Sequence, residues 1–164
     1  MVFKKFLIKR GNNSSGSFFS PFLRLRNMVY KVVFNKTCLY RCYSGKPIFQ
    51  NNLFGFKFGF MNYNSAEFSW SCNNEKILLG ATYYRNGTKH IRQFCELDID
   101  KFYILEIKNL KSYYEFIITD EIEGSVIVAN IRKGNSVNWG FRTFPNFRTF
   151  AMSLQDMEIH MKEL

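Results

Sequence analysis

Carboxylates that alternate along one short stretch are the residues best spaced for acid–base chemistry. In "CELDID", Glu96, Asp98 and Asp100 occupy every second position, so on a β-strand they would share one face with about 6–7 Å between neighbours. Glycosidases place two carboxyl groups beside the scissile bond, one as the acid and one as nucleophile or base. Glu96 and Asp98 therefore support a hydrolase hypothesis. An exposed strand face that runs into a turn explains the same alternation without any catalytic residue.

The sequence gives less support to a nucleophilic, phosphate-binding or metal-binding site. The sequence has no Gly-rich phosphate loop, no nucleophile elbow and only two histidines, His90 and His160, so we expect no metal and no cofactor. The four cysteines, at positions 38, 42, 72 and 95, lie in alternating hydrophobic segments. The first ten residues, "MVFKKFLIKR", do not form a convincing signal peptide. We therefore expect a cytoplasmic protein whose cysteines are free thiols.

Aromatic and amide side chains offer a site for binding rather than for catalysis. A carbohydrate is recognised by an aromatic ring that stacks on its apolar face and by polar groups that bind its hydroxyls. The residues that could form such a site are Lys57, Asn62, Tyr63, Asn138, Trp139, Arg142 and Asn146. The alternative interpretation is a buried Trp139 with asparagines that serve turns.

Positive charge is concentrated near the N-terminus. Of the chain's 23 Lys and Arg residues, eleven precede residue 67, and the first acidic residue is Glu67. Such asymmetry predicts an acidic partner, which could be a protein surface, a second copy in an assembly or nucleic acid. The candidate contacts are Lys4, Lys5, Lys9, Arg10, Arg24 and Arg26. No nucleic-acid recognition module is visible, no stretch approaches transmembrane length, and a solvated basic surface explains the same charges.

Alternation of period two recurs along nearly the whole chain and predicts β-strands. The expected strands are 3–9, 22–34, 37–43, 53–61, 65–71, 76–84, 88–98, 101–108, 112–119, 124–131, 137–144 and 154–162. Between two of them, Asn86-Gly87 is a strong signal for a type I′ hairpin turn. Ten to twelve antiparallel strands must each hide one face, which predicts an all-β, two-sheet sandwich of the jelly-roll or concanavalin-like kind. We expect a basic strand and flexible loop over 1–21 and one sandwich domain over 22–164.

The stretch "LFGFKFGF" shows how such a strand divides its two faces. Phe54, Phe56, Phe58 and Phe60 are expected to pack between the sheets, while Gly55, Lys57 and Gly59 face the other way. A face with so little bulk is either the floor of a groove that a ligand or neighbouring backbone approaches, or the mark of a bend or bulge.

The order of motifs resembles small concanavalin-like β-sandwich proteins of Bacteroidota and their tailed phages. The motifs are "LFGFKFGF", "NSAEFSW", "YYRNG", "CELDI", "YEFII", "WGFRTFPNF" and "LQDMEIHM", which cover about residues 50–164. Family members follow the strand after the hairpins with two glycines, where this chain has Arg148 and Thr149. Asp156 matches the family pattern, but Leu154 and Gln155 replace a proline and a histidine. The resemblance implies a fold and carries little about activity.

Together these features predict a protein that is no enzyme and works by binding. The first hypothesis is a virion or accessory component, encoded by or derived from a phage, that docks through its basic N-terminal region. A lectin-like carbohydrate-binding domain is the alternative, and a glycoside hydrolase that uses Glu96 and Asp98 is a third.

Overall fold

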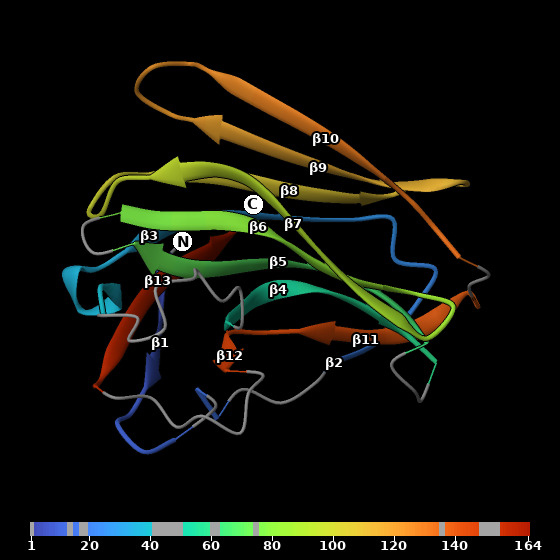
Figure 1. Cartoon of the computed structure of the whole chain (residues 1–164), viewed down its shortest axis with the longest axis horizontal. Helices are drawn as coiled ribbons and strands as arrows, with labels where there is room; N and C mark the ends of the chain where they lie inside the picture. The colour runs from blue at the N-terminus through green and yellow to red at the C-terminus, as the bar shows by residue number, and fades with distance from the viewer. Residues whose placement is uncertain are drawn as a thin grey trace.

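The computed structural model of the chain describes residues 2–12, 15–16, 20–40, 51–59, 63–73, 76–134, 137–147 and 155–164. Within these residues the strands form two antiparallel sheets that pack face to face (Figure 1). The prediction of an all-β, two-sheet sandwich is therefore confirmed. In the same residues no helix is long and apolar enough to span a membrane.

The two sheets have different strand orders. Sheet A has the order β1-β13-β3-β8-β9-β10, and sheet B has the order β2-β11-β4-β5-β6-β7 with the short β12 beside β4. The strands of sheet A are β1 (Lys4–Ile8), β3 (Asn27–Phe34), β8 (Tyr103–Asn109), β9 (Tyr113–Asp120), β10 (Val126–Arg132) and β13 (Met157–Glu163). Those of sheet B are β2 (Ser20–Leu23), β4 (Asn51–Phe58), β5 (Asn64–Asn73), β6 (Lys76–Arg85), β7 (Thr88–Leu97), β11 (Trp139–Thr143) and β12 (Asn146–Phe147).

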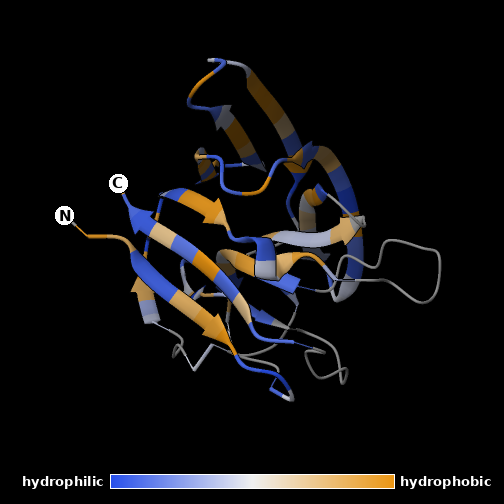
Figure 2. Ribbon diagram, turned by 90° about the vertical axis from the view of Figure 1, so that its left-hand side faces the viewer, coloured by the Kyte–Doolittle hydropathy of each residue, from blue (hydrophilic) through white to orange (hydrophobic). Residues whose placement is uncertain are grey.

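Aromatic rings fill the space between the sheets. Phe54, Phe56 and Phe58 of β4 are buried there as predicted, whereas Phe60 lies outside the described residues. Phe68 of β5 lies with its ring centroid 4.9 Å from that of Phe116 on β9, so it joins the two sheets directly. Figure 2 shows the hydrophobic and hydrophilic residues alternating along the strands, which is the pattern that buries one face of each sheet.

The hairpin between β6 and β7 has the predicted turn. Asn86 and Gly87 have φ angles of 51° and 81°, and a type I′ turn needs positive values at both positions.

Two predicted strands differ from the structure. The predicted strand 22–34 is broken because Arg24 has a φ of 57°, and its backbone N–H donates to the carbonyl of Asn138 at 2.8 Å. The predicted strand 37–43 is wrong at its start, where a 3₁₀ helix, η1 (Lys36–Cys38), begins after Asn35. The Asn35 side chain accepts a bond from the Thr37 N–H, and asparagine favours such turns for this reason.

Gly55 is required by a close approach of β4 and β5. A Cβ atom at this position would lie 2.2 Å from the backbone oxygen of Ala66 and 2.5 Å from the Cα of Glu67. The bulge in β4 lies between Asn52 and Phe54, before the glycine. Of the two interpretations of Gly55, the approach of a neighbouring backbone is therefore the one that the structure supports.

The N-terminal strand pairs within its own chain. β1 is the edge strand of sheet A and is antiparallel to β13, so the first and last strands lie side by side. β2 pairs with β11 in sheet B. Both basic N-terminal segments are thus built into the two sheets.

Candidate functional site

The outer face of sheet B carries the side chains that point away from the core. Because Phe58 faces sheet A and lies opposite Gly140, the neighbouring residues Trp139 and Phe141 face outward. Lys57 lies opposite both Phe141 and Ser65, so it shares that face.

The centre of this outer face is polar and buried. Four alternating residues of β5 point outward and are fully buried, as are two threonines on flanking strands. These residues are Ser65, Glu67, Ser69, Ser71, Thr82 and Thr143. Glu67 lies opposite Gly55 on one side and Thr82 on the other. Since none of these side chains is exposed, a ligand that approaches from solvent meets the face elsewhere.

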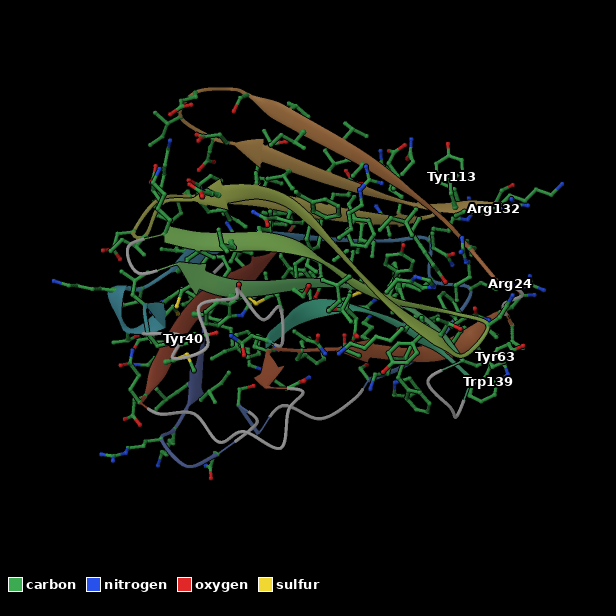
Figure 3. The ribbon with its side chains drawn as sticks, viewed as in Figure 1. Arg24, Tyr40, Tyr63, Tyr113, Arg132 and Trp139 are labelled. Carbon is green, nitrogen blue, oxygen red and sulfur yellow. The ribbon has the colours of Figure 1, made fainter. Side chains whose placement is uncertain are left out.

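The accessible part of the face lies at one end of sheet B, where we define an aromatic platform as Lys57, Tyr63, Tyr84, Trp139 and Phe141. Tyr63 is 52% exposed, and the other four side chains are half-buried. The rings of Trp139 and Phe141 meet edge to face with centroids 6.3 Å apart. Figure 3 shows Tyr63 and Trp139 at the same end of the sandwich, beside Arg24.

The hairpin between β6 and β7 holds Tyr63 in place. The Gly87 N–H donates to the Tyr63 carbonyl at 2.9 Å, and the Tyr63 ring lies against Gly87. The Asn86 N–H donates to the side-chain oxygen of Asn64 at 3.2 Å. A side chain at Gly134 would collide with both asparagines, so the connection between β10 and β11 packs tightly on this hairpin.

Trp139 is held by its neighbours on both sides. Its carbonyl accepts a bond from the Gly59 N–H at 3.2 Å, where Gly59 ends β4 with a φ of 71°. On the other side Trp139 lies opposite Leu23. The bond from Arg24 to Asn138 then continues this pairing beyond β2. The platform thus rests on strand ends with fixed backbone contacts.

The structure separates the predicted ligand-binding residues into groups. Lys57, Tyr63 and Trp139 lie together in the platform, and the exposed Asn138 adjoins it. Asn62 lies outside the described residues.

Arg142 and Asn146 are placed elsewhere. Arg142 lies opposite Phe56, so it points toward sheet A, where its guanidinium pairs with Glu163 at 2.9 Å. Asn146 lies opposite Asn52, and its side chain donates to the Phe144 carbonyl at 2.9 Å. Arg142 therefore links the two sheets and Asn146 serves a turn.

Two platform residues were missed by sequence reasoning. Phe141 could have been found because it is two residues from Trp139, and strand alternation places both on one face. Tyr84 could have been found from the hairpin, since the register set by Asn86-Gly87 and the inward Tyr83 leave Tyr84 outward. Nothing in the sequence shows that Glu67 is buried.

The predicted contacts for an acidic partner do not form one patch. Lys5 pairs with Glu158, and the Arg10 N–H donates to the Asp156 carboxylate at 2.7 Å. Both lie along β1 and at its C-terminal end, with Lys4 and Lys9 exposed nearby. Arg24 and Arg26 occupy the connection between β2 and β3, and Figure 3 shows Arg24 at the platform end of the molecule.

The acidic candidates lie at the end of the sandwich opposite the platform. Glu96 and Asp98 are about half-exposed and both face Lys76, at 3.9 and 3.7 Å. They line one side of a cleft of about 160 Å³. Across this cleft Lys101 pairs with Asp120 at 2.7 Å. Bonds from the backbone N–H groups of Glu123 and Ile122 and from the Lys101 ammonium hold the pKa of Asp120 below its usual value.

The described cysteines are free thiols. Burial raises the pKa of Cys38 to about 12 and that of Cys95 to about 11, so neither is a ready nucleophile at neutral pH. Among the described residues, no group of three or more His, Cys, Asp or Glu is arranged to hold a metal ion.

Comparison by sequence finds no match: no protein-family model and no curated protein matches the chain. By structure it is similar to an alginate lyase from Klebsiella pneumoniae, with a TM-score of 0.66 and 4% identity over 85% of this chain and 59% of that chain. It is also similar to a functionally unknown protein from Saccharomyces cerevisiae, with a TM-score of 0.55 and 8% identity over 94% of this chain and 77% of that chain. A xylan β-1,4-xylosidase from Bacillus halodurans has a TM-score of 0.54 and 9% identity over 98% of this chain and 32% of that chain.

These likenesses support a β-sandwich fold and correct one prediction. The expectation that the protein is no enzyme is contradicted, because two solved structures with this fold are carbohydrate-active enzymes. The chain spans 59% of the length of the alginate lyase, and at these identities the likeness shows the fold alone. The narrower kinship with proteins of Bacteroidota and their phages stays a prediction.

Proposed function

We propose that the protein binds a carbohydrate at the aromatic platform. The observation that carries the proposal is the pair of aromatic side chains, Tyr63 and Trp139, held at the accessible end of the outer face of sheet B. A sugar ring stacks its apolar face on such rings, while its hydroxyls bind neighbouring polar groups. Lys57 and Asn138 supply those groups here.

The placement of the platform also supports the proposal. Trp139 is half-buried and Tyr63 is half-exposed. Each ring therefore packs partly against the protein and presents the rest of its surface to solvent. Their backbones are fixed by strand ends and by the hairpin turn at Gly87, and a site built on rigid elements loses little entropy when a ligand binds. Solved structures that share this fold include a lyase and a xylosidase named for polysaccharide substrates.

The test is binding to a panel of polysaccharides in affinity gel electrophoresis, with quantification by calorimetry. Trp139→Ala and Tyr63→Ala should each weaken binding by tenfold or more, because central aromatic contacts contribute about 2 kcal/mol or more in many interfaces. Phe102→Ala is the matched control, since Phe102 is 39% exposed and lies at the opposite end. Equal loss in all three variants, or no bound polysaccharide, would overturn the proposal.

Two other hypotheses drawn from the sequence, a virion role and glycoside hydrolysis, stay predictions. A role in a virion, with docking through the basic N-terminal residues, rests on the sequence alone. Hydrolysis by Glu96 and Asp98 would need a site at the far end from the platform, where both carboxylates already face Lys76.

A further inference from the structure

The connections at the two ends of the sandwich differ in charge. At the platform end, the connections between β2 and β3, β4 and β5, β6 and β7, β8 and β9, and β10 and β11 contain no Asp or Glu. At the other end the charges are mixed: the connections between β7 and β8 and between β9 and β10 carry Asp98, Asp100, Glu121 and Glu123, and Lys36 and Lys101 lie at the same end. Because neighbouring strands are antiparallel, alternate connections lie at the same end of the sandwich. Figure 1 shows this at the end where β6 turns into β7 and where β11 begins.

Cations surround the platform from both sheets, and we call this set the cationic end. Its members are Arg24, Arg26, Arg85, Lys89, Lys108, Lys111, Arg132 and Lys133. Figure 3 shows Arg24 and Arg132 at this end together with Tyr63 and Trp139. The nearby carboxylates are engaged: Glu115 pairs with Lys108 at 3.0 Å, and Glu163 pairs with Arg142.

A cavity of about 470 Å³ opens within this set. It is lined by Arg26, Asn27, Lys108, Asn109, Leu110 and Lys111. Its walls are fixed, because the Asn109 N–H donates to the Arg26 carbonyl at 2.6 Å and the Asn109 side chain donates to the Leu25 carbonyl at 3.1 Å. Arg26 and Lys111 are exposed and form no ion pair with any residue that the structure describes. Their charges are available to a ligand.

The connection between β2 and β3 links the cavity to the platform. Arg24 is bonded to Asn138 beside Trp139, and Arg26 follows two residues later, at most about 7 Å along the chain. A polysaccharide that stacks on Trp139 would therefore reach the cavity within a few sugar residues.

We infer that the ligand of the platform is an acidic polysaccharide, and that the cavity beside Arg26 and Lys111 binds its carboxylate or sulfate groups. The inference rests on the proposed function and names the class of glycan. Lys and Arg bind carboxylate and sulfate oxygens with charge-assisted hydrogen bonds, which are stronger than those between neutral groups. The aromatic platform supplies the contact with the sugar that charge alone would not give.

The experiment compares matched pairs of polysaccharides with the whole chain. Binding is measured by calorimetry for polygalacturonate against its methyl ester, for dextran sulfate against dextran, and for single-stranded DNA, each at about 50 and about 200 mM salt. We expect tight, salt-sensitive binding to one or both acidic glycans and weaker binding to their neutral partners. Which pair responds distinguishes carboxylate from sulfate.

Two double variants locate the charge. Arg26→Gln with Lys111→Gln should weaken binding to the acidic glycan by about 5- to 30-fold. This range corresponds to a loss of about 0.5–1 kcal/mol for each of the two exposed charge contacts. Lys9→Gln with Lys36→Gln removes the same net charge from the other end and should change it less than about twofold. Lys111→Arg keeps the charge and should keep the affinity, and circular dichroism checks that each variant is folded.

Each other result overturns the inference in a distinct way. Equal affinity for acidic and neutral glycans would refute the acidic class and leave the platform intact. Tighter binding of DNA than of either acidic glycan would make the cationic end a nucleic-acid surface. An equal loss in both double variants would show a response to net charge alone, and binding to no glycan would refute the proposed function itself.

Discussion

Phe68 gives the sharpest test of how the two sheets are held together. Its side chain is fully buried, and its ring centroid lies 5.2 Å from Phe54 of β4, 6.3 Å from Phe94 of β7 and 4.9 Å from Phe116 of β9. Phe68→Ala removes contacts to three strands, one of them in the opposite sheet.

The expected loss in the free energy of unfolding is about 4–5 kcal/mol. Truncation of a buried Phe to Ala costs about 3–5 kcal/mol, and favourable aromatic pairs add about 0.5–1.5 kcal/mol each, which favours the upper part of that range. For a chain of this length about 1 kcal/mol shifts the Tm by roughly 2–4 °C, so the Tm should fall by about 8–20 °C.

Urea denaturation followed by circular dichroism measures the loss, with a thermal scan as a check. Phe102→Ala is the control, because Phe102 is 39% exposed and should cost about 1 kcal/mol or less. A loss below about 1.5 kcal/mol for Phe68→Ala, or an equal loss in the control, would refute the packing of the sheets described above.

Three further predictions concern the backbone, the charges and the thiols. Gly55→Ala should destabilise the fold by about 1–3 kcal/mol or more, because its Cβ would meet the Ala66 oxygen; an unchanged urea midpoint would contradict the close approach of β4 and β5. The folded-state pKa of Asp120 is lowered, so its stabilisation is present above the unfolded pKa of about 3.9 and is lost as the pH falls through the folded value. Urea midpoints measured from neutral to acid pH should therefore fall less steeply for Asp120→Asn than for the parent. Cys38 is fully buried, and burial raises the pKa of its thiol to about 12, so it should resist alkylation at pH 8 until urea unfolds the chain. Rapid labelling of Cys38 in the native protein, seen by mass spectrometry, would contradict this burial.

The parts of the fold that the sequence predicts are those set by local chemistry. The alternation in "LFGFKFGF" places Phe54, Phe56 and Phe58 in the core because strand geometry alone sends them to one side. Asn86-Gly87 predicts its turn because both residues tolerate positive φ.

The parts that the sequence does not predict depend on distant partners. Arg24 adopts a positive φ, which is uncommon for residues other than glycine, where it bonds to Asn138. Arg142 follows Trp139 by three residues in the sequence, yet the register of β11 against β4 turns it toward Glu163. The cavity at Arg26 and Lys111 is lined by two connections that are far apart in the chain, so no local sequence pattern predicts it.

The most direct test of the central claim uses the two tryptophans of the chain. Trp70 is fully buried in the core, whereas Trp139 is half-buried in the platform, so acrylamide should quench mainly the emission of Trp139. If a polysaccharide binds at the platform, saturating amounts should protect this emission from quenching, and Trp139→Phe should abolish the protection. Saturable binding of a polysaccharide that leaves the quenching of Trp139 unchanged would place the ligand elsewhere and contradict the account.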